Sequence, residues 1–322
     1  MTMMITIPEA LALSQTLIQK ALKGSGLNIS TVTAYLSQST GKGLRSVLLL
    51  HTSADAEGLV HPDAATAAAA LEILHLATLV HDDVIDNSDT RRGLPSLHKR
   101  FDTKTAVICG DYLLAMSLSL LTEIDHRRLD APDAHLEMLP QVTKALGALA
   151  KGEYLQHLNL GNADLHLFTY LKIISGKTAA LFYIAAYLGA IIGNEPLENA
   201  KNLGEFGRSL GMAFQISDDC KDYEWTTETA GKPVALDVSN KVMSLPMLLA
   251  LRQNPELKVL LKTLSPDTSF AFAQAVVKAG GTKEAKQLSE KYALKAKKHL
   301  RHTHGTKQER LLSIMDKLQK GI

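Results

Sequence analysis

The sequence has few cysteines and little net charge, and both shortages narrow the kinds of protein it encodes. Among 322 residues there are two cysteines, and the formal net charge is +2. Cys109 and Cys220 lie far apart in the chain, without metal-ligand spacing, and suit a reducing, cytoplasmic setting. A chain without a strong charge field is not expected to bind nucleic acid or an anionic membrane surface.

Targeting and membrane-spanning patterns are also missing. The first lysine is Lys20, so the N-terminal segment lacks the positive region of a secretory signal, and we expect a helix to open near Pro8. The longest apolar run, residues 179–193, is short for a bilayer span. We interpret it as a buried core helix and expect no transmembrane segment.

Alternating runs of β-branched residues are absent, and helical periodicity dominates throughout. Length alone would allow two domains, but no interdomain linker or solenoid repeat is visible. Glycine and proline breakers divide the chain into about ten or more helices with short connections. We therefore predict an all-α fold in which residues 1–322 form one domain.

A dense group of charged residues follows the apolar stretch that begins at residue 71. Asp82 and Asp86 are i and i+4 on a helix, so both carboxylates project from one face, with Asp83 beside them. Such a pair is costly to desolvate unless a hard cation takes its oxygens, and Mg²⁺ held by one or two carboxylates keeps positions for phosphate. Arg91 and Arg92 follow, and their planar forks bind phosphate bidentately. The segment predicts a metal and diphosphate site.

The same aspartate spacing recurs in a second apolar helix, at Asp218, Asp219 and Asp222. Gln215 shares a helix face with Asp218 and Asp222. A solvated acidic turn would explain one isolated motif, but two copies favour a cleft lined by carboxylates from two helices.

Basic residues elsewhere are ambiguous on their own. Lys42 and Arg45 are i and i+3 at a helix start, where they would face one anion or solvent. Lys177 lies in an apolar helical pattern, so it either reaches an anionic partner or extends to the surface. Asp111 also lies among apolar residues, and we interpret it as a satisfied buried carboxylate rather than a metal ligand.

A loop rich in glycine and proline follows the second aspartate motif. Lys232 and Lys241 flank Asp237 there, and a mobile basic loop of this kind would close over phosphate and exclude water. We interpret residues 284–322, which are lysine-rich and amphipathic, as a solvated outer helix pair.

Several ordered motifs together carry a resemblance. They are GKxxR at residues 41–45, LEILHLATLVHDDVID followed by RRG at 71–93, GDYLL at 110–114, KT at 177–178, FQxxDDxxD at 214–222 and GKPxxxD with a following LP at 231–246. Over nearly its whole length the chain resembles the trans-isoprenyl diphosphate synthases of the polyprenyl synthetase family. The resemblance implies an all-α bundle around a central cavity, usually dimeric, which joins isopentenyl diphosphate to an allylic diphosphate such as dimethylallyl, geranyl or farnesyl diphosphate.

The resemblance also implies roles for matching residues. The resemblance implies three Mg²⁺ ions that the allylic diphosphate bridges. Their ligands are implied among the clustered aspartates, which are Asp82, Asp83, Asp86, Asp218, Asp219, Asp222 and Asp237. Isopentenyl diphosphate is implied at Lys42, Arg45, His75 and Arg92. The allylic diphosphate is implied at Arg91, Lys177 and Lys232, with Lys241 nearby, and the reacting centre at Thr178, Phe214 and Gln215. For His75, anion binding is favoured over a general-base role.

Two positions depart from the family pattern. Ser46 stands where the family often has proline, and Lys221 lies inside the second aspartate motif. Neither change removes a charge from the site, and helical geometry predicts that Lys221 points off the face of Asp218 and Asp222.

Product length depends on the residues below the first aspartate motif. Ala77 and Thr78 are small, so a growing tail is expected to pass them, and Leu71 lies on the same face about 16 Å below Asp82 as a possible floor. We predict a product of geranylgeranyl length or longer. A homodimer is expected, either alone or with a small partner subunit. The catalytic subunit of a heteromeric hexaprenyl or heptaprenyl diphosphate synthase, a non-catalytic subunit and a terpene cyclase are the alternatives.

Overall fold

The protein is described by a computed structural model that covers residues 3–24, 29–38, 41, 43–124, 138–224, 238 and 240–320. These residues are mostly helical, which confirms the predicted all-α class. They fall into two compact units. Unit 1 is drawn from Met1–Pro140, Ala185–Leu203 and Thr303–Leu311, and unit 2 from Gln141–Ile184, Gly204–His302 and Leu312–Ile322. The single domain over residues 1–322 stays a prediction.

Unit 1 contains the N-terminal helices and four very short strands. The helices are α1 (Ile7–Lys23), α2 (Ser30–Leu36), α3 (Leu44–Ser53), α4 (Pro62–Ile85), α5 (Leu97–Arg100) and α6 (Thr103–Thr122). The strands form two antiparallel pairs, β1 (Ile5–Thr6) with β2 (Leu59–Val60) and β3 (Thr90–Arg91) with β4 (Leu94–Pro95). Each strand has only two residues, which is too short to leave an alternating pattern in the sequence.

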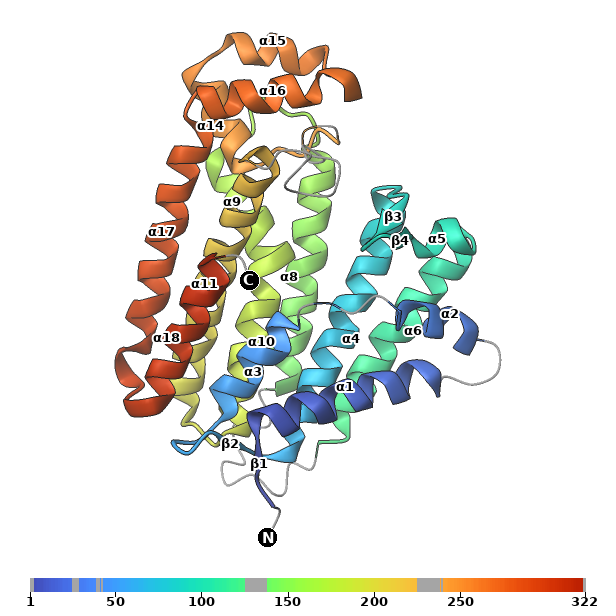
Figure 1. Cartoon of the computed structure of the whole chain (residues 1–322), viewed down its shortest axis with the longest axis vertical. Coiled ribbons are helices and arrows are strands. Elements are labelled where there is room, and N and C mark those ends of the chain that lie inside the picture. Colours follow the sequence, from blue (N-terminus) through green and yellow to red (C-terminus); the bar gives the residue numbers. More distant parts are fainter. Residues whose placement is uncertain are drawn as a thin grey trace. The chain divides into compact units, whose positions relative to one another are not determined.

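Local sequence explains where the helices of unit 1 begin. Thr6 caps α1 in a reciprocal capping box with Glu9, and a proline occupies the first turn, which confirms the helix predicted near Pro8. In α4 the alanine-rich turns are buried, so neighbouring helices approach closely. α4 runs beside α6, and Ser117 Oγ donates a hydrogen bond to the Ala70 carbonyl at 2.7 Å (Figure 1). Nearer the other end of α4, Val80 shares an apolar cluster with Ala106 and Cys109 of α6, and this packing holds the end that carries the first aspartate motif.

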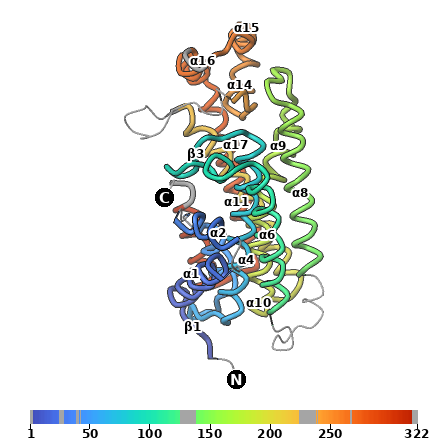
Figure 2. Tube along the Cα trace, turned by 90° about the vertical axis from the view of Figure 1, so that its right-hand side faces the viewer, coloured from blue at the N-terminus to red at the C-terminus, as the bar shows by residue number. Residues whose placement is uncertain are grey.

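Unit 2 contains α9 (Leu167–Ile174), a π-helical turn η2 (Ser175–Ala179), α14 (Leu245–Gln253), α15 (Glu256–Lys262), α16 (Pro266–Lys278), α17 (Gly281–His299) and a 3₁₀ turn η3 (Leu300–His302). α14, α15 and α16 lie together (Figure 2). The helices α8 (Met138–Leu158), α10 (Ala180–Ile192), α11 (Leu197–Glu224) and α18 (Gly305–Lys320) have residues in both units. The predicted C-terminal helix pair is present as α17 and α18, but α17 also buries Ala285 and Ala296.

Among the described residues, three helices are long and apolar enough to cross a membrane by length and composition alone: Pro62–Ile85, Thr103–Thr122 and Leu167–Ile192. The apolar helix at residues 179–193 is longer than the sequence pattern indicated, because α10 continues the helix that begins at Leu167. Its apolar stretch is 83% buried inside the protein, as predicted for a core helix, whereas that of α6 is only 33% buried. The expectation of no transmembrane segment stays a prediction.

Candidate active site

The first aspartate motif lies at the C-terminal end of α4. The amide of Asp86 donates to the Asp82 carbonyl at 2.8 Å, so the helical backbone continues to Asp86, which caps the helix. The two carboxylates therefore lie one turn apart on one face, as the spacing predicts. Asp82 is half-buried and Asp86 is exposed.

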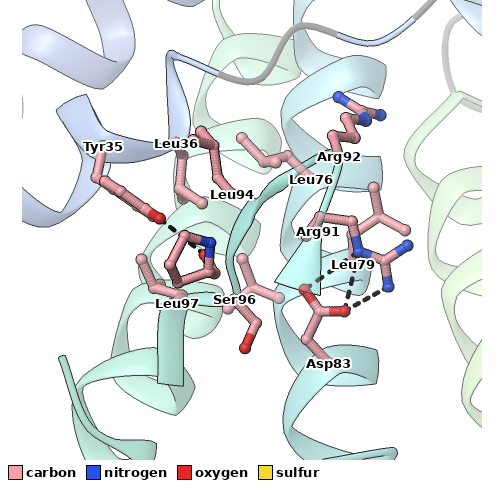
Figure 3. Close-up of a pocket in the computed structure, with 12 residues that line it drawn as sticks. Tyr35, Leu36, Leu76, Leu79, Asp83, Arg91, Arg92, Leu94, Ser96 and Leu97 are labelled. Carbon is pink, nitrogen blue, oxygen red and sulfur yellow. Dashed lines mark hydrogen bonds and ion pairs between the residues drawn. The ribbon is translucent and has the colours of Figure 1, made fainter. Parts of the chain in front are cut away.

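Asp83, between them, points into unit 1 and binds Arg91. Arg91 Nε donates to both carboxylate oxygens, at 2.9 and 3.2 Å, and Nη2 makes a further short contact with Oδ1 (Figure 3). Burial opposes the charge of Arg91, but the hydrogen bond with Asp83 and the charges of Asp83, Asp82 and Asp86 outweigh burial and raise the Arg91 pKa. Asp83, a member of the predicted metal cluster, thus already holds a cation.

The β3–β4 hairpin carries Arg91 and Arg92 back toward α4. Its two-residue turn has φ values of +53° at Arg92 and +81° at Gly93, the backbone that a tight hairpin of this kind requires. Arg92 extends away from Asp83 (Figure 3). A Cβ on Gly41 would lie only 2.6 Å from Arg92 Nη2, so a glycine at residue 41 leaves room for the guanidinium.

A cavity of about 490 Å³ in unit 1 brings several predicted substrate residues together. His75, Arg92 and Gly41 line it along with Glu72, while α1 and α4 supply apolar side chains, namely Leu11, Ile18, Leu22, Leu76 and Leu79. Burial and then the charges of Arg45, Arg92 and Arg91 hold the pKa of His75 well below its usual value. The cavity thus carries a polar group of Glu72, His75 and Arg92 beside an apolar wall.

Arg45 and Ser46 start α3 beside this cavity. Burial lowers the pKa of Arg45, and the charge of Glu72 opposes that shift. The Ser46 amide donates to Glu72 Oε1 at 3.2 Å, a bond that proline lacks the hydrogen to make. The departure at Ser46 thus positions Glu72, a residue that sequence reasoning missed. Lys42 lies outside the described residues.

The GDYLL segment lies against α4. A Cβ on Gly110 would lie 2.2 Å from His81 Nε2, so this glycine admits the imidazole. His81 Nε2 is 3.4 Å from Asp111 Oδ1, and the Asp111 side chain is 69% exposed. The interpretation of Asp111 as a buried carboxylate was wrong, because the outer face of α6 is open to solvent there.

The three residues predicted to set product length lie along α4. Leu71 and Ala77 are buried, and Ala77 belongs to an apolar cluster that includes Val80, Cys109 and Leu113. Thr78 is half-buried, and its hydroxyl donates to the His75 carbonyl at 2.8 Å. None of the three lines the cavity described above.

In unit 2, Lys177 and Thr178 lie in the π-helical turn between α9 and α10. Lys177 Nζ is 2.8 and 3.0 Å from the two oxygens of Glu153, a buried residue of α8. A Cβ on Gly176 would lie 2.3 Å from the Ala148 carbonyl, and a Cβ on Gly152 would lie 2.7 Å from the Lys177 amide. Two glycines thus let the turn touch α8, and Glu153, which left no signal in the sequence, holds the lysine.

The second aspartate motif lies on α11, and its middle aspartate is buried like Asp83. Asp219 accepts hydrogen bonds from Tyr170 Oη and Gln215 Nε2, both at 2.7 Å. Gln215 Oε1 accepts from the Thr178 hydroxyl at 2.6 Å. Burial raises the pKa of Asp219 to about 6 against the opposing hydrogen bonds of Gln215 and Tyr170. The structure thus joins Thr178 and Gln215, two residues predicted at the reacting centre.

Asp218 and Asp222 are the more accessible members of this motif. Asp218 is exposed, Asp222 is half-buried, and Lys221 Nζ lies 3.7 Å from Asp218 Oδ1. The prediction that Lys221 points off this face was wrong, because the lysine is long enough to fold back one helical turn. Phe214 packs on Phe182 at a centroid distance of 5.5 Å.

The basic loop is described only at its end. Lys241 is exposed in a left-handed backbone conformation (φ +55°), and its carbonyl accepts from the Gly161 amide at 2.9 Å. Lys232 and Asp237 lie outside the described residues.

Comparison with known proteins places these features in one family. The model of the polyprenyl synthetase family matches residues 27–279. A prenyl transferase of Cyanophora paradoxa is 36% identical over 80% of this chain and 78% of its own length. Component 2 of heptaprenyl diphosphate synthase from Geobacillus stearothermophilus is 33% identical over 89% of this chain and 86% of its own length.

Solved structures agree with the sequence relatives. The heptaprenyl diphosphate synthase of Staphylococcus aureus has a TM-score of 0.86 and 31% identity, and 98% of each chain is covered. A polyprenyl synthase of Caulobacter crescentus, complexed with calcium and isoprenyl diphosphate, has a TM-score of 0.83 and 26% identity and covers 98% of this chain and 97% of its own. The chain therefore belongs to the polyprenyl synthetase family and is a prenyltransferase of the trans-polyprenyl diphosphate synthase type.

Proposed function

We propose that this prenyltransferase uses Mg²⁺ to condense isopentenyl diphosphate with an allylic diphosphate, giving an all-trans product of geranylgeranyl length or longer. The cavity of unit 1 carries the proposal. It combines a polar group of side chains, in which the Arg92 guanidinium lies with the neutral His75 imidazole and Glu72, and a wall of leucine and isoleucine side chains. That combination suits a short isoprenoid with a charged head, because the diphosphate needs cationic donors and the hydrocarbon needs apolar contact.

The donor set fits a hard divalent cation. Asp82 with Asp86, and Asp218 with Asp222, each offer carboxylate oxygens one helical turn apart, at an accessible helix surface. No group of three potential ligands is already assembled among the residues that the structure describes. Two carboxylates completed by substrate phosphate oxygens is the usual arrangement for Mg²⁺. When bound, Mg²⁺ neutralises the charge that develops on the departing diphosphate.

The protein side chains bind and orient the two substrates. In unit 1, Arg45, His75 and Arg92, with Lys42, hold isopentenyl diphosphate, and Arg91 holds the allylic diphosphate. Their positive charge favours the diphosphate leaving group, so the allylic C–O bond ionises to a delocalised carbocation. The isopentenyl double bond attacks this carbocation, and the released diphosphate takes the proton that is lost.

Neutral side chains also take part in this scheme. His75, with a pKa well below its usual value, is neutral at pH 7 and donates one hydrogen bond, which suits anion binding. Gln215 and Thr178 lie at the reacting centre, where the amide and hydroxyl dipoles act on the developing positive charge. Asp83 and Asp219, which hold Arg91 and Gln215, orient these side chains.

The experiment that tests this function is incubation of the purified chain with isopentenyl diphosphate, an allylic primer and Mg²⁺, followed by mass spectrometry of the products. We expect geranylgeranyl diphosphate or longer chains, and no turnover when EDTA removes the metal. Absence of condensation with every primer would refute the activity. Release of farnesyl diphosphate as the final product would refute the predicted length.

Product length has its own test on α4. Thr78→Phe should shorten the product towards farnesyl diphosphate, because the ring fills space one turn below Asp82, and Leu71→Ala should lengthen it. Ala77→Phe should also shorten the product, but with a fall in Tm, because Ala77 lies in a packed cluster. An unchanged product distribution in Thr78→Phe would refute this account.

We further infer a cytoplasmic homodimer, in which α6 contributes to the interface. Both cysteines are free and buried, which suits a reducing compartment. Val107 and Ile108 on the poorly buried helix α6 are 39% and 51% exposed, and an apolar face of this kind requires a cover. The Geobacillus relative is named component 2 of its enzyme, which makes a separate small subunit the alternative.

Light scattering distinguishes these assemblies. The wild-type chain should have the mass of a dimer, and Ile108→Glu should shift it towards monomer. Leu294→Glu, at a 62% exposed leucine of α17, is the matched control and should leave the mass unchanged. A monomeric wild type that gains mass only with a second kind of subunit would support the heteromer.

A further inference from the structure

Tyr170 is a buried tyrosine of α9 that no motif identifies. It is 2% exposed, and its hydroxyl donates a hydrogen bond of 2.7 Å to Asp219 Oδ2 on α11. Burying a phenol is stabilising only if its hydroxyl finds a partner, and here the partner is the middle residue of the second aspartate motif. The contact ties a residue without an assigned role to the proposed reacting centre.

The contact is one link of a longer chain of hydrogen bonds. Asp219 uses its other oxygen, Oδ1, to accept from Gln215 Nε2 at 2.7 Å. Gln215 then accepts from the Thr178 hydroxyl at its amide oxygen, at 2.6 Å. Each link has a short donor–acceptor distance, and the order is Tyr170, Asp219, Gln215, Thr178.

The chain of bonds determines the direction of the Gln215 amide. A carboxylate only accepts hydrogen bonds, so the NH₂ group of Gln215 must face Asp219 and the carbonyl must face Thr178. The reverse orientation would place the amide oxygen against a carboxylate oxygen. Tyr170 holds the second oxygen of that carboxylate and, together with the backbone amide of Leu245, which also bonds to Asp219, it fixes the rotation of Asp219 about its side-chain bonds.

The same residues bracket the π-helical turn. Tyr170 precedes η2 in the chain and Thr178 lies within it, and both are tied to α11, through Asp219 and Gln215 respectively. An irregular turn of this kind has poorer backbone hydrogen bonding than an α-helix and is common at functional sites. The contacts of Tyr170 and Thr178 with α11 therefore fix the helical rotation of the backbone at Thr178, and with it the direction of the Thr178 hydroxyl.

We propose that Tyr170 is a positioning residue, which acts through Asp219 to set the orientation of the Gln215 amide and the Thr178 hydroxyl at the reacting centre. The proposal rests on the prenyl-condensing function proposed above. It adds a residue outside the motifs and gives Asp219 an orienting role in place of metal binding.

The test compares two buried tyrosine hydroxyls of unit 2. Tyr170→Phe removes the hydroxyl bonded to Asp219, and Tyr223→Phe removes one that lies 2.6 Å from Ser244 Oγ. Tyr223 is 5% exposed, so Tyr223→Phe and Tyr170→Phe each remove one buried, hydrogen-bonded hydroxyl. Both variants should show a similar fall in Tm, measured by calorimetry.

Kinetics should separate the two variants. Tyr170→Phe should lower kcat about tenfold, the size of one lost hydrogen bond at the transition state, with KM for both substrates within about twofold of wild type. The Mg²⁺ concentration for half-maximal rate should not change, because Tyr170 does not act through the metal. Tyr223→Phe should keep the wild-type kcat.

A double variant tests whether Tyr170 acts through Asp219. Because Tyr170 acts through Asp219, Tyr170→Phe/Asp219→Asn should be no slower than Asp219→Asn alone. Additive losses in the double variant, equal kcat values in the two tyrosine variants, or a shifted Mg²⁺ requirement in Tyr170→Phe would each overturn the positioning role. A wild type that condenses no allylic primer would instead refute the proposed function itself.

Discussion

The two aspartate motifs have the same spacing, yet their middle residues lie in opposite electrostatic surroundings. Asp83 is bound by the guanidinium of Arg91, with Arg45, Arg92 and His75 nearby in the same unit. Asp219 is bound by neutral donors, the Tyr170 hydroxyl and the Gln215 amide.

The same sequence pattern thus places its middle aspartate in two kinds of surroundings. At the first site, the buried carboxylate anchors a cation, and the surrounding positive charge suits diphosphate. At the second site, the buried carboxylate orients an amide and a hydroxyl, groups suited to a developing carbocation. In both motifs the outer aspartates remain at the helix surface, where metal binding is proposed.

The largest expected effect comes from removing an outer aspartate. Asp82→Ala and Asp218→Ala should each lower kcat/KM for condensation by a hundredfold or more, about 3 kcal/mol, because each removes a ligand of the proposed metal. Asp89→Ala, at an exposed aspartate paired with Lys99, is the control and should have wild-type turnover. Circular dichroism should show that all three variants are folded. Turnover within tenfold of wild type in either motif variant, at saturating Mg²⁺, would refute the metal assignment.

The middle aspartates should differ in what they contribute to stability. Asp83→Ala leaves the Arg91 guanidinium partly buried without its carboxylate, so the free energy of unfolding in urea should fall by about 2 kcal/mol. Asp219→Ala leaves only neutral donors and should cost about 1 kcal/mol.

A second variant checks the cause of that difference. Asp83→Ala/Arg91→Met removes both charges and should regain part of the lost stability, because no charged group is left unpaired. A larger fall in the free energy of unfolding in Asp219→Ala than in Asp83→Ala would show that the unpaired charge of Arg91 does not set the cost of losing the carboxylate.

The two sites should also respond to pH with opposite sign. His75 has a folded-state pKa well below 6.5, so the unfolded state takes up its proton first and stability falls as pH drops below about 6.5. Asp219 has a folded-state pKa of about 6, above its unfolded value of 3.8, so the folded state takes up its proton first. Protonation of Asp219 therefore makes the folded state more stable as pH drops from about 6 to 4.

Unfolding in urea with EDTA present, at pH 7.5 and at pH 4.5, measures how the free energy of unfolding depends on His75 and on Asp219. Relative to wild type, His75→Gln should lose less stability on acidification, and Asp219→Asn should lose more, each by about 1–2 kcal/mol. The same sign of change in both variants would show that the two sites are not electrostatically opposed.

Sequence reasoning reached the helical fold and the residues with strong local patterns. The i, i+4 spacing was enough to place Asp82 and Asp86 on one face, because α-helical geometry is local. The partners of the middle aspartates depend on tertiary packing. Tyr170 is 49 residues from Asp219, and Glu153 is 24 from Lys177, so no local pattern joins them. Lys221 was misplaced because helix periodicity gives the direction of the Cα–Cβ bond and not the end of a long side chain.

The smallest expected effect concerns Gly41, which leaves room for Arg92. Gly41→Ala should raise KM for isopentenyl diphosphate about three- to tenfold with little change in Tm, because the new Cβ displaces only the mobile end of the Arg92 side chain. Arg92→Ala should raise the same KM further, and in that background Gly41→Ala should have no additional effect, since its target is gone. For both variants KM for the allylic primer should change less. Additive effects, or a larger rise in KM for the allylic primer, would mean that Gly41 and Arg92 do not act together on isopentenyl diphosphate.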